Sequence, residues 1–255
     1  MLLFKLLTVP LFILLITLAG KKWGSEIAGT LGGFPVVAGP IIFFLTLEQG
    51  VNFGINASIS AIYGSIGLLV FGLSYGWCCQ SFNPFICILV ALISWFVTAY
   101  LVALLPTQMI WAVCITIFFL VLIPRLLPKI EEQVRPIQNL KDLPIRVIVG
   151  ALLTFSITTL ANELGEVWSG ILSVFPIISL VLAVFTHITL GKKHVVQIFR
   201  GMSRGLYSFI TYFIVYALMI KTYSIWTTIF VALLISLFCQ YFIQKMQFKK
   251  LSLNP

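Results

Sequence analysis

Charged side chains are scarce in this chain, so those inside or beside its apolar runs are the first candidates for chemistry. The titratable candidates are Glu26, Glu163, Glu166 and His187, whereas Glu48 at another span end is better explained by helix capping. A carboxylate in a low-dielectric site attracts a cation, and it carries a proton if burial raises its pKa. Histidine titrates near neutral pH and can relay protons. We take these four residues as candidates for handling a cation or a proton, with helix capping and interfacial hydrogen bonding as the alternative roles.

Two arginines form a second candidate group. Arg200 and Arg204 are four residues apart, so they share one face of a helix and could bind an anionic group together. The alternative is that they extend their charged heads to the water interface and set the membrane topology.

One string matches a hydrolase motif. Residues 201–205 read Gly-Met-Ser-Arg-Gly, the G-x-S-x-G pattern of a nucleophile elbow. That motif needs a turn between a strand and a helix, whereas Ser203 is expected in a helix among basic residues. The sequence has no Walker motif, no dinucleotide fingerprint and no metal-ligand spacing among its five cysteines. We therefore expect no enzymatic activity, no cofactor and no metal site.

A pattern of glycine and Phe-Pro occurs twice. Gly-x(4)-Gly-x(4)-Phe-Pro spans residues 24–35 and again 165–176, and Gly50 and Gly64 recur as Gly191 and Gly205, all at an offset of 141 residues. Because glycine and proline alter backbone geometry, shared positions indicate shared bends and close contacts. Small residues also recur every four positions, which predicts a flat stripe for close backbone approach. The stripe comprises Gly24, Ala28 and Gly32, with counterparts Gly165, Ser169 and Ser173, and Gly29 and Gly33 form a neighbouring small edge.

The Phe-Pro pairs predict interruptions in two membrane helices. Proline removes a backbone donor and clashes with the preceding turn, so each helix should bend or open there. Exposed carbonyls at membrane depth survive only where protein or a water-filled cavity covers them. We expect the two breaks to meet near the midplane and form a substrate site, although both could serve packing alone. Its walls would be Gly29, Gly32, Gly33, Phe34 and Pro35 from the first copy, and Gly170, Ser173, Phe175 and Pro176 from the second.

Composition indicates the setting of these residues. The mean hydropathy is +1.11 and charged residues are 9% of the chain, against roughly 25% in soluble domains. Apolar runs of about 20 residues match the thickness of a bilayer, which predicts an all-α polytopic membrane protein. We expect about nine transmembrane helices, with ends uncertain by several residues, at 3–19, 27–47, 53–75, 84–105, 108–125, 146–162, 167–190, 201–220 and 223–243.

Positive charge predicts the orientation of these helices. With the N-terminus outside, nearly all lysines and arginines fall on one side, which should be cytoplasmic, and only Lys5 and Lys221 fall on the other. The basic excess therefore reflects topology, and we expect no nucleic acid as partner. The residues on the cytoplasmic side would be Lys21, Lys22, Arg125, Lys129, Arg135, Lys141, Arg146, Lys192, Lys193, Arg200, Arg204, Lys245, Lys249 and Lys250.

Nine crossings and one offset predict the organisation. Residues 1–105 would form a first repeat of four helices, residues 106–145 a single linking helix with a cytoplasmic linker, and residues 146–255 a second repeat of four helices with a short tail. An odd number of crossings before the second copy turns it upside down. This is the four-plus-one-plus-four, inverted-topology arrangement found in many secondary transporters.

Residues 170–176, Gly-Ile-Leu-Ser-Val-Phe-Pro, followed by Phe185-Thr186-His187 and Gly191, resemble the small bacterial GlpM-like inner-membrane proteins. The resemblance covers about 45 residues of each copy and is stronger in the second. The resemblance implies a four-helix unit with a Gly-x(4)-Phe-Pro helix, and it does not indicate any substrate.

Together these patterns predict a permease of the bacterial inner membrane. A small solute or ion would pass by alternating access around the paired broken helices. The expected partners are the lipid bilayer and that solute, and a homo-oligomer is left open. Two rivals are a flippase for a lipid-linked carrier, which should show a lateral opening and a basic pocket, and a membrane scaffold that transports nothing.

Overall fold

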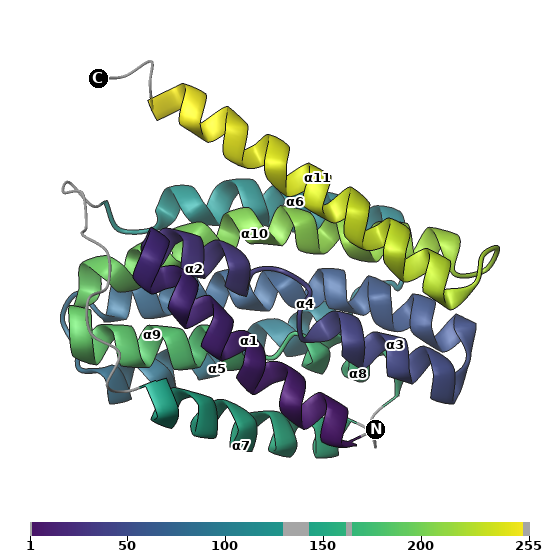
Figure 1. Ribbon diagram of the computed structural model, residues 1–255, viewed down its shortest axis with the longest axis horizontal. Coiled ribbons are helices and arrows are strands. Elements are labelled where there is room, and N and C mark those ends of the chain that lie inside the picture. Colours follow the sequence, from purple (N-terminus) through teal and green to yellow (C-terminus); the bar gives the residue numbers. More distant parts are fainter. Residues whose placement is uncertain (1, 130–142, 162–164, 252–255) are drawn as a thin grey trace.

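The computed structural model describes residues 2–129, 143–161 and 165–251, and these form helices joined by short turns with no strand among them (Figure 1). Five helical segments are long and apolar enough to cross a membrane, which confirms a helical chain of membrane type. They are Val51–Cys78, Pro84–Ala103, Met109–Leu126, Glu166–Leu190 and Ile225–Lys245. The expected count of nine crossings stays a prediction.

Eleven helices are present in the described residues, most of them running roughly parallel to the long axis of the molecule (Figure 1). They are α1 (Leu2–Trp23), α2 (Ser25–Gly32), α3 (Ala38–Gln49), α4 (Val51–Cys78), α5 (Pro84–Ala103), α6 (Met109–Leu126), α7 (Leu143–Ala161), α8 (Glu166–Ser173), α9 (Ile177–Leu190), α10 (Lys192–Met219) and α11 (Ile225–Leu251).

Local sequence explains several helix boundaries. Asn83 caps α5 by accepting a hydrogen bond from the amide of Ile86, and Pro84 occupies the first turn, where a missing donor has no cost. Gly50 and Gly191 each stand alone between two helices with φ of +94° and +85°. Only glycine adopts this conformation readily, so these two positions permit the sharp turns into α4 and α10.

Helix lengths recur at the offset seen in the sequence. Helices α2 and α8 have 8 residues each, and α4 and α10 have 28 each, with first residues 141 positions apart in both pairs. The chief packing partner of α2 is α10, and that of α8 is α4, so each short helix lies against the long helix of the other half. The main core cluster draws on both halves, because α4 and α10 are its centre. The predicted domain boundaries at 105 and 145 stay a prediction.

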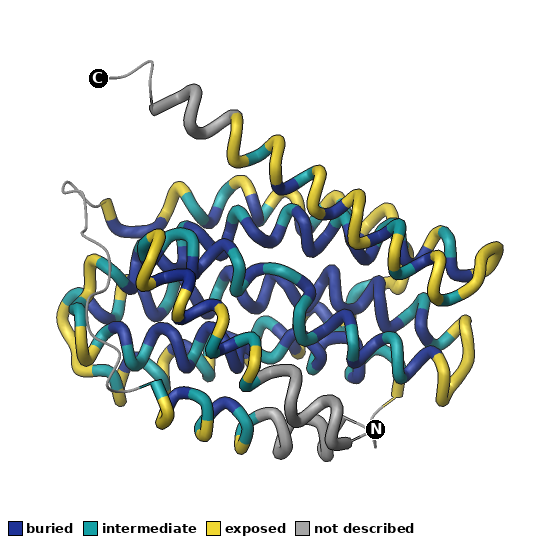
Figure 2. Tube along the Cα trace, viewed as in Figure 1, coloured by how far each residue is buried: buried dark blue, intermediate teal, exposed yellow. Residues whose placement is uncertain are grey.

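Burial separates an inner pair of helices from an outer shell. Helices α4 and α10 are buried along most of their length, whereas α11 is exposed along much of its outer side (Figure 2). The outer faces of α5, α6 and α11 present large apolar side chains such as Ile93, Phe118 and Phe238, which are more than 60% exposed. Contiguous apolar surface of this kind is unfavourable in water and favourable against hydrocarbon, which fits a membrane-embedded protein.

The two ends of the molecule differ in charge. The start of α10 meets the ends of α4 and α6, where Lys192 donates to the carbonyl of Gln80 at 3.1 Å and Arg200 to that of Pro128 at 2.8 Å. We call this the basic end. Among the described side chains it holds Lys21, Lys22, Arg125, Lys129, Arg146, Lys192, Lys193, Arg200 and Arg204. At the opposite end, where α3 turns into α4 and α10 turns into α11, the charged side chains described are Glu48, Glu166 and Lys221.

Candidate functional site

Both predicted helix interruptions are present. Helix α2 ends at Gly32 and α3 begins at Ala38, with Pro35 in the irregular segment between them. Helix α8 ends at Ser173 and α9 begins at Ile177, with Pro176 at the junction. The two pairs run in opposite directions along the molecule, because α2 starts at the basic end and α8 at the opposite end (Figure 1).

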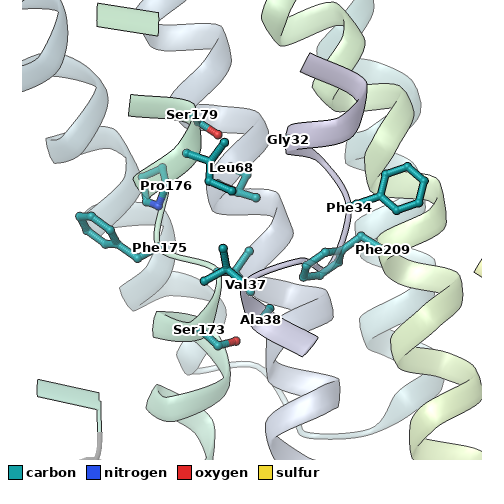
Figure 3. A pocket seen from close by; sticks show the side chains of 12 residues that line it. Gly32, Phe34, Val37, Ala38, Leu68, Ser173, Phe175, Pro176, Ser179 and Phe209 are labelled. Carbon is teal, nitrogen blue, oxygen red and sulfur yellow. The ribbon is translucent and has the colours of Figure 1, made fainter. Parts of the chain in front are cut away.

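The two breaks line one small cavity of about 30 Å³. Figure 3 shows the breaks on either side of it, with Val37 turned inward and the rings of Phe34 and Phe175 turned outward. Of the nine predicted wall residues, five line this cavity: Gly32, Phe34, Ser173, Phe175 and Pro176. Gly29, Gly33, Pro35 and Gly170 lie outside it. Residues of α4 and α10 that the sequence did not single out, Leu68 and Phe209, complete the lining.

The polarity of the cavity comes from backbone groups. The amides of Val37, the residue before α3, and of Ala38, its first residue, have no backbone hydrogen-bond partner in the described part of the chain. The same holds for the amides of Ile178 and Ser179 at the start of α9. All four residues line the cavity, so the partly positive N-termini of two helices converge on it.

The two serine hydroxyls in the lining are already engaged. Ser173 donates to the carbonyl of Gly170 at 2.6 Å, and Ser179 donates to the sulfur of Met202 at 2.9 Å. A small acceptor in the cavity would therefore meet no free serine hydroxyl.

Glycines hold α2 directly against α10. A methyl group added at Gly29 would lie 1.9 Å from the carbonyl oxygen of Ile198, and one at Gly33 would lie 2.5 Å from that of Met202. From the other side, a methyl group at Gly205 would lie 2.1 Å from the carbonyl oxygen of Thr30. The close contacts with α10 therefore lie one position after the predicted stripe of Gly24, Ala28 and Gly32. Gly24 touches nothing within 4 Å and Gly32 meets only the side chains of α9, because the face of α2 that meets α10 carries Gly29 and Gly33.

The second break is packed in the corresponding way. A methyl group at Gly170 would lie 2.3 Å from the carbonyl oxygen of Ala57, and one at Gly64 would lie 3.2 Å from the Cα of Ile171. Gly29 and Ile198 correspond to Gly170 and Ala57 at the same offset of 141. None of these glycines lines the cavity. They permit the close helix contacts that hold the two breaks in place: Gly29, Gly33 and Gly170.

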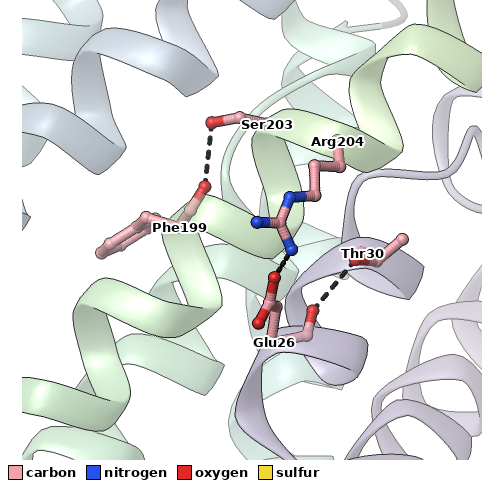
Figure 4. Close-up of polar contacts among 5 residues, drawn as sticks. All are labelled: Glu26, Thr30, Phe199, Ser203 and Arg204. Atoms are coloured by element: carbon pink, nitrogen blue, oxygen red, sulfur yellow. Dashed lines mark hydrogen bonds and ion pairs between the residues drawn. The ribbon is translucent and has the colours of Figure 1, made fainter. Parts of the chain in front are cut away.

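Arg204 and Glu26 form an ion pair between α10 and the first turn of α2 (Figure 4). The carbonyl of Glu26 also accepts a hydrogen bond from the hydroxyl of Thr30 at 3.0 Å. Arg200, one turn earlier, donates to the carbonyl of Pro128. Both arginines therefore have protein partners in this structure, and the joint anion site stays a prediction.

The remaining predicted proton carriers lie apart from the cavity. At the opposite end, Glu166 accepts a hydrogen bond of 3.0 Å from the side-chain Nδ2 of Asn56. His187 Nδ1 lies 3.4 Å from the hydroxyl of Tyr75, and the two rings meet edge to face. Glu163 falls outside the described residues. None of the described candidates, Glu26, Glu166 and His187, lines the cavity.

His194 is a polar residue that sequence reasoning missed. Its Nδ1 lies 2.9 Å from the hydroxyl of Ser25, and burial lowers the pKa of its imidazole. Position 194 precedes the predicted span and has no motif around it. In the sequence, His194 is distinguished only by its position directly after Lys192 and Lys193.

Ser203 has a structural position. Its hydroxyl donates to the carbonyl of Phe199 at 2.9 Å in the middle of α10, as Figure 4 shows. The flanking residues of the G-x-S-x-G string, Gly201 and Gly205, are the ones that permit contact with α2. Helix packing thus accounts for this string.

No protein-family model, curated protein or solved structure matches this chain. The resemblance to GlpM-like proteins stays a prediction.

Proposed function

We propose that this protein is an integral membrane permease that moves a small solute or ion by alternating access around its two broken helices. The observation that carries the proposal is the cavity between the breaks, which is lined by residues at the starts of α3 and α9 whose amides have no backbone hydrogen-bond partner in the described chain. Discontinuous helices whose ends point at a central site are the feature by which many secondary transporters bind substrate.

The size and polarity of the cavity support a small substrate. About 30 Å³ is enough for one or two water-sized particles, since roughly 10–15 Å³ of such space accepts one water. Amide donors and the positive ends of α3 and α9 favour a group that accepts hydrogen bonds, including an anion. Within the class of small solutes and ions, we therefore expect a substrate with an acceptor group.

Inverted topology is part of the proposal. Helices that correspond at the offset of 141 start from opposite ends of the molecule, and their close contacts recur between α2 and α10 and between α8 and α4. These relations support two repeats of four helices joined by α6, with nine crossings in total. The basic end would face the cytoplasm of a bacterial cell, because cytoplasmic loops carry an excess of lysine and arginine.

Polar contacts at the two mouths suggest how access would alternate. At the basic end, Glu26 and Ser25 of α2 contact Arg204 and His194 of α10. At the opposite end, Glu166 of α8 contacts Asn56 of α4. Opening one mouth would break its contacts while those at the other remain. Protonation of Glu26, Glu163, Glu166 or His187 would couple this step to an ion gradient, and uptake insensitive to both pH and sodium gradients would contradict that part.

The proposal is tested with proteoliposomes placed in isotonic solutions of small salts and small neutral solutes, with swelling followed by light scattering. Gly32→Ala adds a methyl group beside the cavity at an ordinary contact of 3.4 Å from Ile178, so the variant should fold. We expect its flux to fall about tenfold, the effect of about 1.4 kcal/mol on a barrier. Gly165→Ala is the control, since its added methyl group meets nothing within 4 Å.

The outcomes separate a permease from a scaffold. Wild-type vesicles that swell no faster than empty ones in every solution would contradict the permease. If Gly32→Ala and Gly165→Ala behaved alike while wild-type protein conducted, the central cavity would not be the path. Pro35→Ala and Pro176→Ala, measured for flux and thermal stability together, would show whether the breaks serve packing alone.

A further inference from the structure

A second hollow lies on the outer flank of the first break. It is a groove of about 660 Å³ between α1, α3, α10 and α11, and it is distinct from the central cavity. Phe12, Phe43, Phe44 and Trp226 give it an aromatic lining, and no charged residue takes part. Volumes of 300–1,000 Å³ with apolar walls and few polar groups are typical of ligand sites.

Tyr212 supplies a hydrogen-bonding group inside this apolar groove. The side chain is only 3% exposed, yet its hydroxyl has no hydrogen-bond partner among the described residues. Gly39 of α3 lies next to this hydroxyl, since a methyl group added at Gly39 would lie 3.5 Å from the hydroxyl oxygen. Because Tyr212 lines the groove, this hydroxyl is available to hydrogen-bond with a molecule that occupies it.

The lining determines the chemistry of that partner. A hydrocarbon body fits the aromatic and aliphatic walls. A charged head is disfavoured inside the groove, because no opposite charge lines it. The tyrosine hydroxyl both donates and accepts, so it suits an alcohol, ester or quinone oxygen.

We infer that this groove binds an uncharged lipid, with its hydrocarbon chain along α3 and α11 and its polar head at Tyr212. The inference goes beyond the permease and holds whether or not the protein transports anything. Phe34 lines both this groove and the central cavity, and Pro35 and Val36 form part of the groove wall. A bound lipid therefore touches the α2–α3 break itself and would bias its conformation.

The test uses protein in phosphatidylcholine nanodiscs and a hexadecanol that carries a photoactivatable diazirine. We expect saturable labelling of peptides from α3 and α11, with competition by unlabelled hexadecanol and weaker competition by palmitate at pH 8. Tyr212→Phe keeps the ring and removes the hydroxyl, and the apparent affinity should fall about fivefold, as for one lost hydrogen bond.

A matched pair of variants on α11 locates the site. Ile229→Trp should fill the groove and abolish saturable labelling. Phe230→Trp should leave it unchanged, because Phe230 is 64% exposed and lies outside the lining. Labelling that never saturates and spreads over α5 and α6 would show bulk lipid contact only and overturn the inference. Unchanged affinity in Tyr212→Phe, or equal competition by palmitate, would equally overturn it.

Discussion

At the scale of single residues, glycine determines how closely the helices of this protein approach. Gly29 and Gly33 on α2 meet Gly205 and the backbone of α10 at distances that leave no room for a Cβ atom. The same residue type has a different role at Gly50 and Gly191, where a positive φ permits a sharp turn. One residue type thus serves two physical needs, close contact and unusual backbone geometry.

Gly29→Ala should destabilise the protein by about 2–3 kcal/mol, because the new methyl group would overlap the backbone of Ile198 and force α2 away from α10. Thermal unfolding in detergent measures the effect. Gly165→Ala should leave the unfolding temperature unchanged, since that position is open and its φ of −51° suits alanine. Equal losses in both variants would mean that the contact with α10 is not the cause.

His194 should make stability depend on pH. Burial lowers the pKa of its imidazole below the ordinary value of 6.5. Between those two pKa values the unfolded chain binds more protons than the folded one, so stability falls as pH drops below 6.5. The unfolding temperature should decrease between pH 7.5 and pH 5, and His194→Gln should remove part of that decrease. Identical pH profiles for the two proteins would contradict this assignment.

At the scale of elements, the two short helices before the breaks depend on the long helices against which they pack. Helices α2 and α8 are only 8 residues long, too short to be stable alone, so their positions depend on packing against α10 and α4. The ion pair between Glu26 and Arg204 adds a polar tether to the first turn of α2. This tether is the contact most accessible to mutation, because it can be removed without altering the core.

A double-mutant cycle with Glu26→Gln and Arg204→Gln should give a coupling of about 1 kcal/mol, since both side chains remain partly exposed, at 42% and 33%. Unfolding temperatures of the four proteins provide the measurement. Additive effects of the two substitutions would show that the pair does not tether α2. If the tether gates the mouth as proposed, Glu26→Gln should also change flux in proteoliposomes. The hydrogen bond between Asn56 and Glu166 provides the corresponding contact for comparison at the other end.

At the scale of the whole molecule, charge is segregated between two ends. Of the eleven lysine and arginine side chains that are described, nine lie at the basic end, Lys221 lies at the other, and Lys245 lies in the last part of α11. The turns between helices place residues distant in sequence at the same end, as the contact of Lys192 with Gln80 shows. This segregation favours the basic end as the cytoplasmic one.

The orientation can be tested by cysteine accessibility in a variant without native cysteines. Lys221→Cys should react with a membrane-impermeant maleimide added to intact cells, and Lys21→Cys should react only after the membrane is opened. The reverse pattern would invert the proposed topology. Reaction of both from outside would contradict a membrane-spanning arrangement of these helices.

The membrane class of the chain and the location of its two breaks could be predicted from sequence alone. Hydropathy is a sum over residues, and proline removes a backbone donor and clashes with the preceding turn, which favours a break at positions 35 and 176. Pro10 and Pro124 lie inside continuous helices, so proline alone does not decide where a helix is interrupted. The shared offset of 141 likewise predicted close contacts at matching glycines, as found at Gly29 and Gly170. Orientation of the repeats, the number of crossings and the resemblance to a known family stay predictions.

Only the tertiary structure decided which groups meet. Arg204 pairs with Glu26 across 178 positions of sequence, His194 reaches Ser25, and the face of α2 that meets α10 carries Gly29 and Gly33 rather than Gly32. Tyr212 and its groove had no sequence signal, because an isolated tyrosine in an apolar helix is unremarkable until three other helices pack around it. The physical reason is that composition and backbone restrictions act locally, whereas partners and cavities depend on how separate helices pack, which no single segment encodes.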